Sequence, residues 1–360
     1  MRRLGGIWER VVSFDNLLLA YRKARRGKGS RVEVTRFALN LEGELLGLQR
    51  DLVSGAYQPG SYRLFTIYER KPRTIAAALF RDRVVHHAVM NLVEPALNRT
   101  FIDDSYACRR GKGVHAAVDR YQGWARRYTY ALKMDVKQYF PSIDHVMLKE
   151  KLARRIKDQR VLRLLEVIID TSPVYAAAPV YFAGDGLFTP IERRVGIPIG
   201  NLTSQFFANL YLDGLDHYLK EQLQIGPYLR YVDDMVVLSD DKARLHAIRE
   251  AVRERLATDR LRLHPNKAHI TPTAQGLNLL GYFVLHQSRR LRNDNGHRFA
   301  RRLRGFARLY REGRLDWADF NPSVQSWLGH ARHADTLGLR RRIFAETVFV
   351  RGTDHRTASA

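Results

Sequence analysis

Apolar positions recur at two spacings along the chain, and together these predict a mixture of helices and strands. A spacing of three to four residues marks one face of a helix, whereas alternation or a short apolar run marks a strand. The helical spacing predicts helices over 7–26, 35–54, from 81 onward, up to about 157, and over 206–219, 245–256, 323–332 and 337–349. The strand pattern predicts strands over 62–68, 128–134 and 261–265, hairpins around 228–238 and 276–284, and a loop or hairpin insertion over 172–195.

Polar residues at the ends of these segments predict where two of the helices begin. Thr203 or Ser204 is expected to cap the helix that follows the Gly-Ile-Pro-Ile-Gly loop, because short hydroxyl side chains accept hydrogen bonds from the first backbone N–H groups. Asp240 or Asp241 is expected to cap the helix that carries Leu245.

The hairpin at 228–238 has two adjacent carboxylates, Asp233 and Asp234, at its tip. Like charges at an otherwise apolar tip repel each other, so a cation is the simplest group to hold them. Asp135 follows the strand over 128–134, and a carboxylate at a strand end is a common way to present a metal ligand. The alternatives are ordinary turn chemistry for the pair and a capping role for Asp135.

The chain is strongly basic, with 61 Lys and Arg against 37 Asp and Glu and a net charge of +24 over 360 residues. This imbalance predicts a polyanionic partner, nucleic acid first and an anionic membrane surface second. Hydrophobic residues make up 45%, which is typical of a folded protein. The single cysteine, Cys108, excludes an intramolecular disulfide framework and any cysteine-rich zinc site. No apolar run is long enough to cross a bilayer, so we expect a cytosolic protein without membrane contact.

Three acids from two strand ends, Asp135, Asp233 and Asp234, are what a two-metal phosphoryl-transfer site requires. Two Mg²⁺ ions, with Mn²⁺ as a substitute, are the expected cofactors. Lys267 lies on the segment after a predicted strand and is expected to neutralise or protonate the pyrophosphate leaving group.

These motifs resemble those of reverse transcriptases, in the family's order and over nearly the whole chain. Asp135 with Phe140 resembles the metal aspartate and the aromatic gate that excludes ribose, and Tyr231-Val232-Asp233-Asp234 resembles the second metal motif. The resemblance implies a right-hand polymerase of α+β class. It implies N-terminal helices and fingers over 1–127, a palm with an antiparallel sheet and packed helices over 128–285, a helical thumb over 286–350 and a tail over 351–360.

The resemblance also assigns the ligand-binding residues, and it implies Val136 as a further metal ligand. It implies that the incoming nucleotide contacts Lys71, Arg73, Phe140, Ile199, Gly200 and Gln205. The hairpin at Leu280, Gly281 and Tyr282 resembles the primer grip. Basic residues in a glycine-bearing loop and in the arginine-rich stretch over 289–314 are expected to bind nucleic acid: Arg109, Arg110, Lys112, Arg301, Arg302, Arg304 and Arg308.

Within the family, Ile199 and Ser204-Gln205 resemble the enzymes of bacterial and phage diversity-generating retroelements. That group implies error-prone cDNA made from a template RNA, with misincorporation opposite adenines. It also implies dNTPs, a primer, a small basic oligomeric accessory protein and no maturase, endonuclease or RNase H extension. Two alternatives stay open: a phage-defence reverse transcriptase of the unclassified groups, and a non-catalytic RNA-binding scaffold on the same fold.

Overall fold

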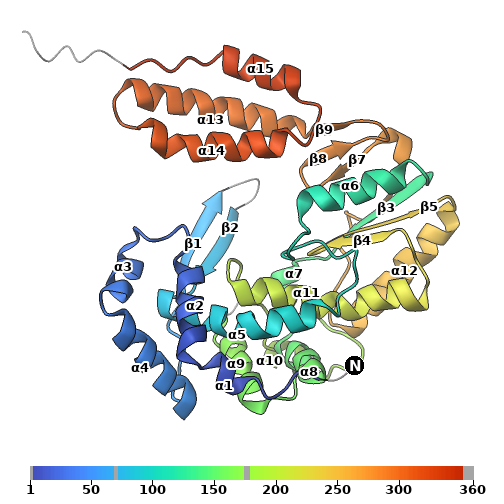
Figure 1. Cartoon of the computed structure of the whole chain (residues 1–360). Helices are drawn as coiled ribbons and strands as arrows, with labels where there is room; N and C mark the ends of the chain where they lie inside the picture. The colour runs from blue at the N-terminus through green and yellow to red at the C-terminus, as the bar shows by residue number, and fades with distance from the viewer. Residues whose placement is uncertain (1–2, 69–71, 174–178, 352–360) are drawn as a thin grey trace, which may run out of the picture. The chain divides into compact units, whose positions relative to one another are not determined.

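A computed structural model describes residues 3–68, 72–173 and 179–351 as a mixture of helices and antiparallel sheets (Figure 1). The expected α+β class is therefore confirmed, while the division into fingers, palm and thumb stays a prediction. The chain forms two compact units, and each is described by itself. Unit 1 comprises residues up to 113, 133–236 and 246–269, and unit 2 comprises 114–132, 237–245 and 270 onward.

The N-terminal part of unit 1 is a group of helices followed by a hairpin. The helix α2 packs on α5 through buried residues that include Leu17 and Tyr21. Figure 1 draws α1 to α4 in blue, and these helices precede the strands β1 and β2 in the chain. The elements are α1 (Trp8–Val11), α2 (Phe14–Arg25), α3 (Val32–Leu39), α4 (Leu41–Ser54), β1 (Arg63–Tyr68), β2 (Pro72–Ala77) and α5 (Phe80–Asn98).

Two of the expected helices are each broken into two, so the predicted continuous helices over 7–26 and 35–54 were wrong. Ser13 lies between α1 and α2 in an extended conformation, and its hydroxyl accepts a hydrogen bond from the backbone N–H of Asn16. Asn40 separates α3 from α4 with a non-helical backbone. Short polar residues compete with the helix for local hydrogen bonds, and apolar periodicity does not register this competition.

The rest of unit 1 contributes strands to a four-stranded sheet whose order is β4-β5-β3-β6. Its strands are β3 (Tyr130–Asp135), β4 (Tyr228–Tyr231), β5 (Asp234–Ser239) and β6 (His269–Pro272), and the boundary between the two units passes through the sheet. The expected hairpin around 228–238 is confirmed as β4 and β5. The helices are α7 (Tyr139–Ser142), α8 (His145–Arg155), α9 (Gln159–Asp170), α10 (Thr189–Glu192), α11 (Leu202–His217), a π-helical turn (Tyr218–Gln222) and α12 (Lys242–Thr258).

The helix caps differ in part from those expected. Thr203 and Ser204 lie buried inside α11, and Asn201 occupies the position before its first residue, because the helix begins at Leu202, four residues before the apolar stripe starts at Phe206. Asp241 caps α12 as expected, accepting from the backbone N–H of Ala243 at 2.7 Å. Within 172–195, only the short α10 is regular among the described residues, and 174–178 lie outside them.

Unit 2 contains a three-stranded antiparallel sheet and four helices among its described residues. The strand β8 pairs with both β7 and β9, and α6 packs on β8. The elements are α6 (Val114–Ala125), a 3₁₀ turn (Thr273–Gln275), β7 (Leu277–Leu279), β8 (Tyr282–Val284), β9 (Arg289–Leu291), α13 (Asn293–Arg311), α14 (Trp317–Ala331) and α15 (Leu337–Ala345).

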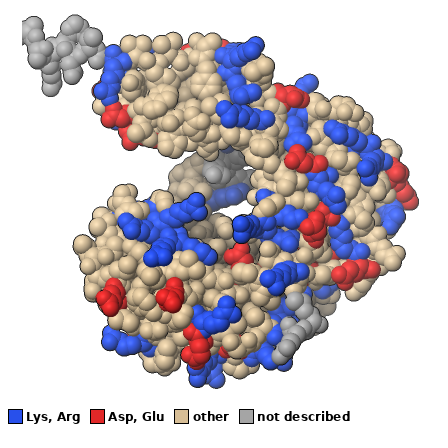
Figure 2. All heavy atoms as spheres, in the orientation of Figure 1, with Lys and Arg blue, Asp and Glu red and all other residues tan. Residues whose placement is uncertain are grey.

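Basic side chains are spread over the face of the molecule that Figure 2 shows. In the face shown in Figure 2, Lys and Arg are more widespread than Asp and Glu, in keeping with the net charge of +24.

In the part of the chain that is described, no helix is both long and apolar enough to span a membrane.

Candidate active site

Three aspartates stand at the ends of neighbouring strands of the four-stranded sheet. β3 ends at Asp135, the turn between β4 and β5 contains Asp233, and β5 begins at Asp234. The sheet order makes β5 the neighbour of β3, so the strand that begins at the acidic turn adjoins the strand that ends in Asp135. The side chain of Lys133 on β3 reaches Asp234 at 3.3 Å, which brings the two strands together at the acids. The predicted convergence of the three acids therefore has a local structural basis.

Asp233 is partly buried and has a perturbed acidity. Its pKa is raised from 3.8 to about 6, first by burial and then by the charges of Asp234 and Asp135. Two nearby carboxylates disfavour ionisation of a third because like charges repel in a poorly solvated site. This mutual repulsion is the electrostatic signature of a site that a cation stabilises.

Two lysines pair with Asp135 and Asp234. Lys267 Nζ lies 2.8 Å from Oδ2 of Asp135, and Lys133 Nζ lies 3.3 Å from Oδ1 of Asp234. Lys267 was expected at the site from the sequence, whereas Lys133 was missed. Its signal is its position, because alternate residues of a strand share one face and Lys133 precedes Asp135 by two.

The segment after Asp135 is fixed by the chain that leads to Lys267. Val136 pairs with Leu263 in an isolated antiparallel bridge, and the backbone N–H of His264 donates to the Asp135 carbonyl at 2.7 Å. The strand expected over 261–265 is reduced to this bridge. The bridge places Lys267 within reach of Asp135, although the two are 132 residues apart.

The donors at this site fit a hard divalent cation in their chemistry. Carboxylate oxygens are the ligands that Mg²⁺ and Mn²⁺ accept most readily. In the described ranges, no group of three or more His, Cys, Asp or Glu side chains is already arranged around an ion position, and Asp135 and Asp234 pair with lysines. These two carboxylates would therefore exchange a lysine contact for the ion.

The loop before α11 lies against the second strand of the N-terminal hairpin. The Ile199 carbonyl accepts from the backbone N–H of Ala76 at 3.3 Å, and Ile199 is half-buried. Gly200 has a φ of +112°, and a Cβ there would stand 3.0 Å from Ile75. Only glycine combines that backbone with so close an approach. Gln205 is exposed on the first turns of α11, so these predicted nucleotide contacts lie on one connected surface.

Of the other predicted nucleotide contacts, the structure describes Arg73 and Phe140 but not Lys71. Arg73 is exposed on β2, opposite Ile67. Phe140 is half-buried in α7, with its carbonyl accepting from Ile197 at 3.0 Å. The prediction for Lys71 falls outside the described residues.

A basic pocket of about 360 Å³ adjoins this loop, and sequence reasoning did not anticipate it. Burial and the neighbouring charges of Arg83 and Arg31 lower the pKa of Lys28. Burial, Lys23 and Lys28 lower the pKa of His87 to about 4. Cations that disfavour one another's charge attract an anion such as phosphate. The lining includes Lys28, Arg31, Arg63, Arg83, Gly200 and Gln205.

Comparison with known proteins identifies the family. Residues 66–284 match the family described as reverse transcriptase (RNA-dependent DNA polymerase), which is more than half of the 360 residues. The chain belongs to the reverse transcriptase family. The matched range contains the three acids, Lys267 and the loop before α11.

The relatives of this reverse transcriptase include bacterial and yeast proteins. Protein YkfC of Escherichia coli (strain K12) is 27% identical over 72% of this chain and 76% of its own length. The putative COX1/OXI3 intron 2 protein of Saccharomyces cerevisiae is 24% identical over 58% of this chain. The group II intron-encoded protein LtrA of Lactococcus lactis subsp. cremoris is 26% identical over 49%. The chain spans only 24% and 28% of the length of these two intron proteins.

In the basic loop of this reverse transcriptase, two of the three residues predicted to bind nucleic acid, Arg109 and Lys112, instead bond to nearby protein groups. Arg109 donates to the carbonyls of Ile102 and Ser105 and to Asn98, so its guanidinium serves the loop itself. Lys112 pairs with Asp103 at 2.6 Å. Arg110 is exposed, and its contact with nucleic acid stays a prediction.

The predicted nucleic-acid contacts of unit 2 lie on the exposed face of α13. The opposite face is buried through Phe299, Leu303 and Ala307, which follow at four-residue intervals. This amphipathic pattern leaves all four arginines predicted to bind nucleic acid exposed: Arg301, Arg302, Arg304 and Arg308.

The predicted primer-grip hairpin is present as β7 and β8. Leu279 pairs with Tyr282 across the turn, and both turn residues have positive φ, +48° at Leu280 and +94° at Gly281. Two positive φ values are typical of the two-residue turn that matches strand twist. The Tyr282 hydroxyl lies 2.8 Å from Nδ1 of His330 and 2.9 Å from its carbonyl, which ties the hairpin to α14.

Proposed function

We propose that this protein synthesises cDNA on an RNA template by two-metal nucleotidyl transfer. The observation that carries the proposal is the gathering of Asp135, Asp233 and Asp234 at adjoining strand ends, where burial, and then the charges of Asp234 and Asp135, raise the pKa of Asp233 to about 6. Mg²⁺, when bound, would stabilise the attacking and leaving oxygens of the phosphoryl transfer. The three carboxylates would hold it.

The surrounding residues would bind and orient the substrates. Lys267 carries a charge beside Asp135 and is half-exposed, so it can turn toward a pyrophosphate leaving group and donate a proton to it. The basic pocket lined by Lys28, Arg31 and Arg63 suits the phosphates of the RNA template next to the templating base. Arg73 on β2 would contact the triphosphate of the dNTP.

We further propose that synthesis is error-prone opposite template adenines, as in diversity-generating retroelements. Ile199 supports this subtype, because its apolar side chain makes no hydrogen bond to an incoming nucleotide and so weakens geometric checking. Its carbonyl bond to Ala76 fixes the loop, so the side chain occupies a set position beside Gly200. A structured template RNA and a small basic oligomeric accessory protein belong to the same proposal.

The error spectrum of an Ile199→Gln variant tests the subtype. Copying of a defined RNA is followed by sequencing of the cDNA, with Ile199→Leu as the matched apolar control. We expect Gln to lower misincorporation opposite adenine about tenfold and Leu to leave it unchanged. Equal adenine errors in wild type and Ile199→Gln would remove Ile199 from the account.

The intron relatives favour a second candidate function, cDNA synthesis from a mobile intron RNA. LtrA and the yeast protein are both named as intron proteins. The DNA beside the gene separates the two. A neighbouring repeat pair in which one copy carries substitutions at adenines supports the retroelement, whereas flanking intron RNA domains support the intron function.

A further inference from the structure

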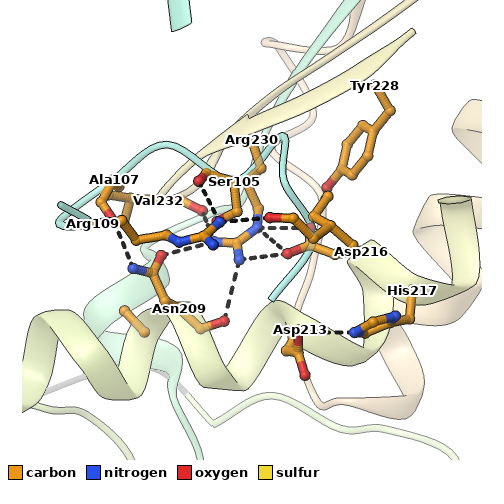
Figure 3. A network of polar contacts seen from close by, with 12 residues as sticks. Ser105, Ala107, Arg109, Asn209, Asp213, Asp216, His217, Tyr228, Arg230 and Val232 are labelled. Atoms are coloured by element: carbon orange, nitrogen blue, oxygen red, sulfur yellow. Dashed lines mark hydrogen bonds and ion pairs between the residues drawn. The ribbon is translucent and has the colours of Figure 1, made fainter. Parts of the chain in front are cut away.

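We propose that Arg230 is a positioning residue for the acidic turn, acting through the backbone carbonyl of Val232. Figure 3 shows the guanidinium of Arg230 between Asp216 on α11 and Val232, the residue before Asp233. This inference rests on the proposed function, because it assigns Arg230 a role in setting the carboxylates that would bind the metal ions.

The side chain of Arg230 is fully buried and makes bonds in two directions. Toward α11, its Nη2 and Nε lie 2.6 and 2.8 Å from the two carboxylate oxygens of Asp216. Toward the turn, its Nη1 donates to the Val232 carbonyl at 3.0 Å. Nη1 also reaches Oδ1 of Asn209 at 3.2 Å. One planar group therefore connects the helix to the residue before Asp233.

The hydrogen bond from Arg230 is accepted by Val232, whose backbone has an unfavourable conformation. Val232 has a φ of +58°, in the left-handed region that a β-branched side chain rarely adopts. Such a backbone persists only where neighbouring groups hold it. The carbonyl of Val232 belongs to the same peptide as the N–H of Asp233, so fixing that carbonyl constrains the backbone from which the side chain of Asp233 projects.

Asp216 is itself fixed, which makes the arrangement rigid. It is fully buried, and Oδ1 also accepts from the Tyr228 hydroxyl at 2.6 Å. The backbone of Arg230 is held independently, with its N–H donating to Asp104 and its carbonyl accepting from Tyr106. Burial alone would lower the pKa of Arg230, but the charge and hydrogen bonds of Asp216 raise it, so the cation persists at any working pH.

An Arg230→Lys variant tests the inference. Lysine keeps the charge for Asp216 but lacks the planar fork that also reaches the turn. We expect binding of Mn²⁺, measured by electron paramagnetic resonance without substrate, to weaken about 10-fold, and kcat to fall about 10- to 100-fold. Binding of the RNA–DNA duplex should stay unchanged. Arg155→Lys is the matched control, since Arg155 pairs with another buried aspartate of α11, Asp213, at 2.5 Å.

Two further variants keep the test decisive. If Arg230→Lys does not fold, the pair Asp216→Leu with Arg230→Met replaces the ion pair by apolar groups, which is often tolerated, and the same losses are expected. Val232→Ala removes the β-branch and should reduce the defect of Arg230→Lys. Wild-type Mn²⁺ affinity and kcat in a folded Arg230 variant would overturn the inference. Failure of Asp233→Asn to affect synthesis would instead overturn the proposed function.

Discussion

The ammonium group of Lys267 lies 2.8 Å from a carboxylate oxygen of Asp135, although 132 residues separate them in the chain. The contact depends on the bridge between Val136 and Leu263, which brings the two segments side by side. Lys267 is about half-exposed and Asp135 is largely buried, so the lysine is the partner free to turn toward a substrate. A cation beside a metal-binding acid is suited to neutralising a leaving pyrophosphate.

Replacing Lys267 by methionine should slow the chemical step without preventing substrate binding. We expect a fall of about 100-fold in the single-turnover rate, because a general acid contributes that much or more. Lys149→Met is the matched control, since Lys149 forms a lysine–aspartate pair of 2.7 Å with Asp170 on α9. An unchanged rate in Lys267→Met would assign the lysine to the pairing with Asp135 alone.

Asp233 should make the protein less stable at neutral pH when no divalent cation is present. Its folded pKa of about 6 exceeds the ordinary 3.8, so the folded state binds a proton that the unfolded state has lost between these values. The free energy of unfolding therefore falls as the pH rises from about 4 to 6, by about 3 kcal/mol. Thermal unfolding of Asp233→Asn at pH 7.5 without divalent cations should occur at a higher temperature than that of wild type.

Thermal unfolding should also be measured with added Mg²⁺, for wild type and for Asp233→Asn. An ion that binds only the folded state raises its stability, so Mg²⁺ should stabilise wild type more than Asp233→Asn. The same increase in both proteins would show that Asp233 takes no part in binding the ion.

Phe140→Ala should admit ribonucleotides. The ring is half-buried beside Tyr139, and its backbone is fixed by Ile197, so the gate stands on a rigid segment. We expect the preference for dNTPs over rNTPs in kcat/KM to fall about tenfold or more, because the 2′-OH is what distinguishes the two. Tyr139→Phe is the control, since Tyr139 is fully packed and its hydroxyl donates to the Ala208 carbonyl. A retained preference in Phe140→Ala would place the gate elsewhere.

Apolar and polar patterns within short segments correctly predicted the hairpins, whose structure depends on neighbouring residues in the chain. The hairpins at Asp233 and at Leu280-Gly281 follow from apolar runs around a short turn, and both are present. The acids at the strand ends follow from the same reasoning. Breaks in the N-terminal helices at Ser13 and Asn40 were missed because the apolar stripe continues across them.

Contacts between distant segments could not be read from the chain. Lys28 and Arg63 meet in one pocket only after the N-terminal helices pack against the hairpin. The pairing of Arg230 with Asp216 joins a strand to a helix. In the sequence, the one hint of it is a charged residue inside an apolar run, Arg230 between Leu229 and Tyr231. A charge in such a place requires a buried partner, but the pattern does not say which.

The most direct test of the account is primer extension on an RNA template by Asp233→Asn, measured together with RNA binding. The three carboxylates are expected to act as one metal-binding unit, so loss of one should abolish cDNA synthesis, and Asp135→Asn should do the same. RNA affinity should stay at the wild-type value, because the basic surfaces are unchanged. Wild-type cDNA synthesis by a folded Asp233→Asn protein would contradict the account.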